Sequence, residues 1–291
     1  MRGEGRYCVT TSDRTLKGPV RGELFIFGAA LCWSLSGVLT KSLHADALLA
    51  NSIRNLIAVI VVFAYNRFKV KVNPTILLAA ACFAVTNITF FYAITLTTAA
   101  NAVVIQYTAP FFVLLFTSLA NRRFPSVWQM GAVAIAFLGV AVVFYSDLGT
   151  GNMIGNLVAL VSGMAFAGVF FVNRLPNASP VDGTVVGFSI AALTGVFFLD
   201  KINTLVTADI PILLVLGIIQ HALAYLLFCN GIKRCSGLSA SLLSMIEVFL
   251  VPLWVFIFIG ETPKLIAALG CLMIMGAVVI NAIAEHKKQV S

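Results

Sequence analysis

The chain has 291 residues, of which 60% are hydrophobic and only 10% carry charge, and its mean hydropathy is +1.01. A soluble globule of this length needs more polar residues than this to cover its surface. The composition therefore excludes a soluble protein and indicates an integral membrane protein surrounded by lipid. The net charge of +8 is accounted for by the basic loops described below, so we expect no nucleic-acid partner.

Ten apolar stretches follow one another along the chain, each close to the roughly 20 residues that a helix needs to cross a bilayer. Strands of a membrane barrel would alternate apolar and polar residues, whereas these stretches are continuously apolar. We therefore predict an all-α membrane protein with ten transmembrane helices. In chain order, the predicted spans are residues 22–43, 48–65, 75–97, 99–120, 126–146, 152–175, 181–199, 210–233, 237–259 and 264–285.

The basic residues predict the orientation of these spans. If both termini lie on one side, 15 of the 19 Lys and Arg residues fall on that side, in the tails and in alternate loops. Lys and Arg accumulate in cytoplasmic loops. We expect both termini in the cytoplasm and the protein in a bacterial inner membrane, with residues 1–21 and 286–291 as cytoplasmic tails.

The two halves of the chain resemble each other. Spans four and nine align at one constant offset, and spans one and six also correspond. The alignment joins residues 93, 94, 99, 102, 110 and 125 to residues 231, 232, 237, 240, 248 and 263. We predict one five-helix repeat over 22–146 and a second over 152–285. Because five is odd, the second repeat enters the membrane upside down, an arrangement typical of transporters.

Several short motifs resemble those of the EamA-type drug/metabolite transporters. In the first repeat they are ALCWSLSGV at 30–38, Arg54 with Ala58, and FYAI at 91–94. In the second repeat they are ALAY at 222–225, ASLLSMIE at 240–247, and Gly260 with Glu261. Departures from the family pattern are Val248 in place of Pro, Arg123 in place of Glu, and Met164 in place of an aromatic residue. The resemblance implies a ten-helix secondary transporter, commonly an exporter of amino acids, amines or related metabolites.

Glu247 is the acidic residue near the centre of a predicted span. A carboxylate there costs roughly 2.5–3.5 kcal/mol on insertion scales and must be neutralised, paired or hydrated. We expect Glu247 to bind a substrate ammonium group or a proton, with Ser244 one turn away on the same stripe. The alternative is a protonated Glu247 that serves packing alone.

Other polar and aromatic residues within the spans are weaker candidates for substrate binding. His221, with Tyr225 one turn later, could relay protons or contact substrate, or be a buried neutral imidazole. Gln106 and Tyr107 occupy the first-repeat positions equivalent to Ser244 and Met245, and Gln106 could equally join helices.

Three further residues complete the predicted binding set: Trp33, Asn87 and Tyr92. Trp33 could form an aromatic wall for an ammonium group, or pack against other helices or lipid. Arg54 could extend outward to water or hold a substrate carboxylate.

Motifs of membrane-embedded or cofactor-dependent enzymes do not occur in this sequence, and His44, His221 and His286 are too scattered to indicate a metal site. We therefore expect neither an enzyme nor a cofactor. We predict a secondary transporter that moves a small amine-bearing metabolite, with export coupled to protons. A broad cationic-drug exporter and a passive channel are the alternatives, and the sequence leaves both monomer and homodimer open.

Overall fold

The computed structural model of the protein describes residues 20–143, 145, 152–259 and 265–290. Several predicted features lie outside the described residues. They are the N-terminal tail over 1–19, the motif residues Gly260 and Glu261, the C-terminal end of span five and the first residue of span ten. The first half contains α1 (Val20–Ser34), α2 (Ser36–Lys41), α3 (Ala47–Tyr65), α4 (Pro74–Leu96), α5 (Ala99–Gln106), α6 (Ala109–Asn121) and α7 (Val127–Val143).

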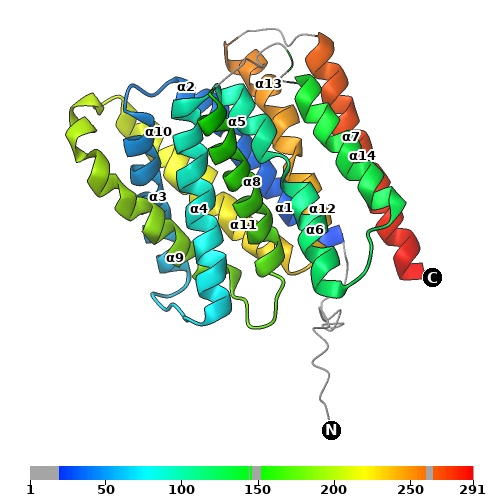
Figure 1. The fold of residues 1–291 in the computed structure, drawn as a ribbon. Helices are drawn as coiled ribbons and strands as arrows, with labels where there is room; N and C mark the ends of the chain where they lie inside the picture. Colours follow the sequence, from blue (N-terminus) through cyan, green and yellow to red (C-terminus); the bar gives the residue numbers. More distant parts are fainter. Residues whose placement is uncertain (1–19, 144, 146–151, 260–264, 291) are drawn as a thin grey trace.

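The second half contains α8 (Met153–Val172), α9 (Pro180–Leu193), the 3₁₀ helix η1 (Thr194–Thr204), α10 (Asp209–Val215), the π-helix η2 (Leu216–Leu223), α11 (Ala224–Ile232), α12 (Gly237–Ser244), α13 (Ile246–Ile259) and α14 (Leu265–Val290). All helices form one bundle (Figure 1).

The predicted all-α membrane fold is confirmed. Among the described residues, eight helical stretches are long and apolar enough to cross a membrane. Two shorter apolar helices, Val127–Val143 and Gly237–Leu250, occupy the places of the predicted fifth and ninth spans. Together they follow the ten predicted spans in order.

The interior of several spans differs from the continuous helices that we expected. The helix of span one is interrupted at Leu35, that of span four at Tyr107 and Thr108, and that of span nine at Met245. Span eight contains a turn of π-helix, and span seven continues past its predicted end as η1. Hydropathy reports how long an apolar stretch is but does not report local changes in the hydrogen-bond pattern of its backbone.

Contacts between the halves have the symmetry expected of a repeat. Helix α4 of span three packs on α8 of span six, and α1 of span one packs on α11 of span eight. Exchanging the two repeats turns the first contact into the second. The contacts α3–α9 and α7–α14 join equivalent spans and map onto themselves. This pattern supports a pseudo-two-fold relation between the halves.

A buried carboxylate ties the connection after α2 to the start of α10. Asp209 is fully buried and accepts hydrogen bonds from the backbone N–H groups of His44 (3.0 Å), Ala45 (3.1 Å) and Val206 (3.2 Å). Its other contact is His44 Nδ1 at 3.2 Å. These bonds satisfy polar groups of two connections, one from each half, at one end of the bundle.

Helices α7 and α14 approach closely along one edge of the bundle (Figure 1). A Cβ atom on Gly139 would lie 2.8 Å from the carbonyl oxygen of Gly270, so the two backbones are in contact. Small residues permit such close packing of transmembrane helices. Gly131 in the same helix has no atom within 4 Å of a corresponding Cβ.

The substitution Gly139→Ala should therefore destabilise the protein by about 1–3 kcal/mol, the usual cost of overpacking. Gly131→Ala is the matched control and should leave stability unchanged or raise it, because Ala favours a helix more than Gly does. The measurement is the thermal unfolding midpoint of the purified protein in detergent. Equal midpoints for the two variants would show that the α7–α14 contact does not need a glycine at 139.

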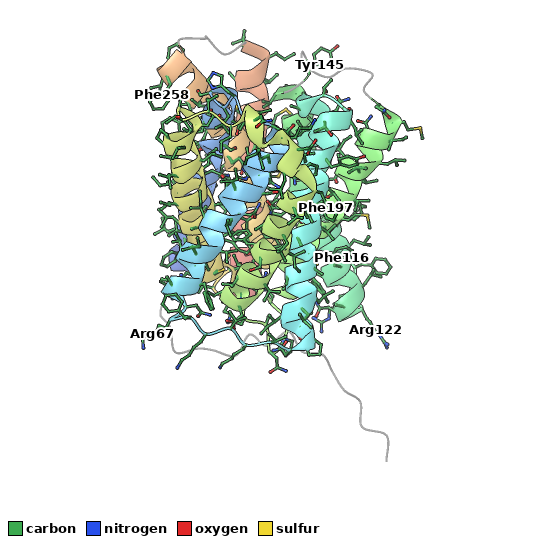
Figure 2. All side chains as sticks on the ribbon, turned by 90° about the vertical axis from the view of Figure 1, so that its left-hand side faces the viewer. Arg67, Phe116, Arg122, Tyr145, Phe197 and Phe258 are labelled. Carbon is green, nitrogen blue, oxygen red and sulfur yellow. The ribbon has the colours of Figure 1, made fainter. Side chains whose placement is uncertain are left out.

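The two ends of the bundle differ in charge. Arg67 and Arg122 lie at one end, and Tyr145 and Phe258 lie at the other (Figure 2). The first end also carries the connections with Lys69, Lys71 and Arg174. The excess of basic side chains at this end favours placing it in the cytoplasm.

A cysteine scan tests this orientation. In a version of the protein without its six cysteines, a single cysteine at Lys201 should react with an impermeant thiol reagent added outside intact cells. A cysteine at Arg122 should react only after the membrane is opened. The reverse labelling pattern would show that the protein has the opposite orientation in the membrane.

Candidate functional site

Two interrupted helices meet near the centre of the bundle. The α5–α6 interruption at Tyr107 and the α12–α13 interruption at Met245 occupy equivalent positions of the two repeats. Pro110 lies in the first turn of α6 and has no N–H to donate to the carbonyl of Gln106, which explains the first interruption. In the second repeat, Val248 replaces this proline, and its N–H bonds the carbonyl of Met245 at 3.0 Å, three residues back.

Glu247 and Tyr107 join the two interruptions. The Tyr107 hydroxyl donates a hydrogen bond to the Glu247 carboxylate. Tyr107 is buried and Glu247 half-buried. Glu247 lies about three helical turns before Phe258, which marks one end of the bundle (Figure 2). No ion pair of Glu247 occurs within the described part of the chain.

Tyr225 on α11 is close to two charged residues, Glu247 and Arg54. Its hydroxyl interacts electrostatically with both groups. The ring packs edge-on against Trp33 and Phe83, with 5.1 Å between ring centroids in each pair, and lies 5.4 Å from His221. Aromatic side chains from α1, α4 and η2 thus pack around Tyr225.

Arg54 on α3 points into the protein. Its side chain is buried, with 6% of its surface exposed, so the interpretation that it extends outward to water is wrong. The Nε atom donates to Asn51 Oδ1 at 3.0 Å and Nη1 to Gln220 Oε1 at 3.5 Å. The guanidinium carbon lies 4.3 Å from the centroid of Phe91, a cation–π contact.

The π-helix η2 positions Gln220 and His221 beside Arg54. Gln220 Oε1 contacts His221 Nδ1 at 3.3 Å, and the His221 ring stacks on Phe188 with 4.7 Å between centroids. His221 Nε2 and Trp33 Nε1 are buried and have no hydrogen-bond partner among the described residues. Single π-turns within α-helices frequently occur at functional sites.

We define the central cluster as the charged, polar and aromatic residues that these contacts connect: Trp33, Arg54, Tyr107, Gln220, His221, Tyr225 and Glu247. Five of them were predicted as binding residues from the sequence. For Arg54, the sequence left open whether its side chain extends outward to water or holds a substrate carboxylate. The available sign of a function was its place in a motif that resembles one of the family. Gln220 was missed because its role depends on the π-turn, which has no clear signature in the sequence.

The remaining predicted binding residues lie elsewhere or bond locally. Gln106 Nε2 donates to Ser162 Oγ at 2.9 Å, and that hydroxyl donates to the Thr86 carbonyl at 3.1 Å, so Gln106 joins helices. Asn87 and Ser244 are buried and bond to carbonyl groups of their own helices. The Tyr92 side chain on α4 is 48% exposed.

A separate cavity of about 180 Å³ opens near Arg174, at the basic end of the bundle. Both halves line it, with residues Leu114, Thr117, Gln129, Phe171, Arg174, Leu175, Ser236, Gly237, Leu238 and Glu285. Its charged groups have partners: Arg174 Nη1 donates to the Ile232 carbonyl at 3.0 Å, and Ser236 donates to Glu285. Within the described residues, no cluster of His, Cys, Asp and Glu could hold a metal ion.

These features define a multi-pass membrane protein with two repeated halves and charged groups at its centre. Residues 20–145 and 153–283 each match the EamA-like transporter family. The chain therefore belongs to the EamA-like transporter family, and it is a membrane transporter and not an enzyme.

Known relatives are similar to this chain over nearly its whole length. The chain is 25% identical to the uncharacterized inner membrane transporter YicL of Salmonella typhimurium, over 92% of this chain and 97% of that protein. It is 28% identical to the uncharacterized transporter YwfM of Bacillus subtilis, over 91% and 95%. A solved crystal structure with 18% identity covers 92% of this chain and 99% of its own, with a TM-score of 0.76, and so shares the fold.

Proposed function

We propose that this transporter exports a small amine-bearing metabolite, such as an amino acid or a related compound, across the inner membrane in exchange for protons. The observation that carries the proposal is the carboxyl group of Glu247, held by Tyr107 at the junction of the two interrupted helices. The Salmonella relative YicL is named as an inner membrane transporter, which supports the same location for this protein.

The chemistry of a half-buried carboxyl group supports exchange of a cation for a proton. Away from water, the neutral protonated acid is favoured over the carboxylate. A substrate ammonium group can stabilise the carboxylate by direct pairing, so binding of the amine releases the proton. One site then accepts either a proton or an amine, which is the requirement for coupled exchange.

The arrangement of the helices supports alternating access. The Tyr107–Glu247 bond connects one repeat to the other, and each partner lies beside a helix interruption. Inverted repeats can rock against each other around a site at their interface, and such sites are commonly built from discontinuous helices. A passive channel does not require a carboxyl group that forms a hydrogen bond between its two halves.

A ligand screen comes first because the substrate is a proposal. Purified protein should be heated with amino acids, polyamines, quaternary amines and nucleosides, and a bound ligand should raise the unfolding midpoint by mass action. Stabilisation by compounds with an ammonium group supports the proposal. Stabilisation by bulky quaternary amines of unrelated shape would instead favour a broad cationic-drug exporter.

The stabilising compound then serves for flux measurements in proteoliposomes. We expect a pH gradient to drive uptake against a concentration gradient, and labelled compound inside to exchange with unlabelled compound outside. Glu247→Gln should abolish the pH-driven flux, because glutamine keeps the shape of the side chain but cannot ionise. Glu247→Asp should retain part of it, since the charge survives one methylene further from its partner.

Asp200→Asn is the control for these substitutions, because the Asp200 side chain is exposed in η1 and, among the described residues, forms an ion pair with Lys201 alone, at 3.6 Å. This variant should transport like the parent protein. Parent-like flux of a correctly inserted Glu247→Gln protein at every pH would refute proton exchange at Glu247, and His221 would become the next candidate. Flux without saturation or exchange would identify a channel.

A further inference from the structure

Arg54 has more hydrogen-bonding capacity than the surrounding protein uses. A guanidinium group has five N–H donors. Nε and Nη1 each donate one bond, to Asn51 and to Gln220, and Nη2 donates none to the residues that the structure describes. No Asp or Glu in the described segments pairs with this buried cation.

Neighbouring atoms independently indicate an unfilled polar position. The side chains of His221 and Trp33 are 3% and 5% exposed, and one ring nitrogen of each has no partner in the described part of the chain. Both rings contact Tyr225, whose hydroxyl interacts with Arg54. Buried polar atoms without a partner are rare, and two of them on rings that pack against Tyr225 indicate that a ligand completes their bonding.

We propose that Arg54 binds the carboxylate of the substrate, so that the transported compound is a zwitterion with its ammonium group at Glu247. This inference rests on the proposed role of Glu247. The guanidinium fork matches a carboxylate in shape and can donate two parallel bonds to it. A single buried cation also suits a singly charged anion better than a phosphate dianion.

The two charges come from different halves of the chain, and this supports the assignment. Arg54 comes from the first repeat and Glu247 from the second, and Tyr225 interacts with both. They do not form an ion pair with each other. A zwitterion would neutralise both groups and connect the two halves, whereas a simple amine would leave Arg54 unpaired.

Matched ligand pairs test the proposal. The probes are the twenty amino acids, each compared with the amine that lacks its carboxyl group, for example leucine with 3-methylbutylamine. Affinities are measured by thermal shift on the full-length parent protein and on Arg54→Gln, Arg54→Lys and Arg234→Gln. Arg234 is the control because its guanidinium also lies over an aromatic ring, 5.1 Å from the Phe25 centroid, but is exposed at the basic end.

We expect at least one amino acid to bind the parent more tightly than its amine does. Arg54→Gln should weaken that amino acid by about 30-fold or more, as expected for loss of one partner of a buried charge pair. The amine should bind the parent and Arg54→Gln alike. Arg54→Lys should keep part of the preference for the amino acid, and Arg234→Gln should keep all of it.

Three results would overturn the proposal. If amines bind and amino acids do not, Arg54 is no carboxylate site, while the proposed function at Glu247 stands. If Arg54→Gln weakens the amino acid and its amine equally, Arg54 only supports the helices. If neither class binds the parent, both proposals fail. If Arg54→Gln does not fold, the test uses the parent and Arg54→Lys. An equal preference of these two proteins for the amino acid over its amine would then overturn the proposal.

Discussion

Inside a bilayer, water is absent, so every buried polar group must find its partner within the protein or in a bound ligand. Continuous helices satisfy this requirement for their own backbones. The protein departs from continuous helix at Leu35, at Tyr107, at Met245 and in the π-turn of span eight. Tyr107 and the π-turn themselves supply residues of the central cluster, and Met245 lies two residues before Glu247. Three of these four departures from continuous helix therefore lie in or beside the central cluster.

The pseudo-two-fold relation between the repeats explains how one chain forms the central cluster. Spans four and nine are interrupted at equivalent positions because the two repeats are related by symmetry. The sequences have diverged at these positions, so that one interruption presents the Tyr107 phenol and the other leads to the Glu247 carboxyl group. A symmetric scaffold thereby gives an asymmetric pair that can hydrogen-bond.

The helices outside the cluster divide into supporting layers. The α4–α8 and α1–α11 contacts enclose the aromatic core, which includes the mutual edge contacts of Phe83, Phe188, Tyr225 and Phe228. The α7–α14 pair packs through Gly139 and Gly270 along one edge. At one end, Asp209 connects loops of both halves. Each of these helix pairs, like the Asp209 bond to His44, joins one half of the chain to the other, so the two halves are held together on several sides of the central cluster.

The sequence by itself determined the membrane fold, the order of the spans and the repeat, because the thickness of the hydrocarbon dictates how long an apolar stretch must be. The second span was predicted over 48–65 and forms Ala47–Tyr65; the third was predicted over 75–97 and forms Pro74–Leu96. Glu247 was also recognisable, because a carboxyl group in such a stretch is costly and rare.

Only the tertiary structure decided which side chains face one another. Lipid is as apolar as the protein interior, so a uniformly apolar helix does not show in its sequence which face turns inward. Of the residues predicted at the site, Tyr92 is 48% exposed and Gln106 bonds to Ser162. Arg54 points inward because Asn51, Gln220 and Phe91 receive it there. Gln220 belongs to the other repeat, and only folding brings it to Arg54.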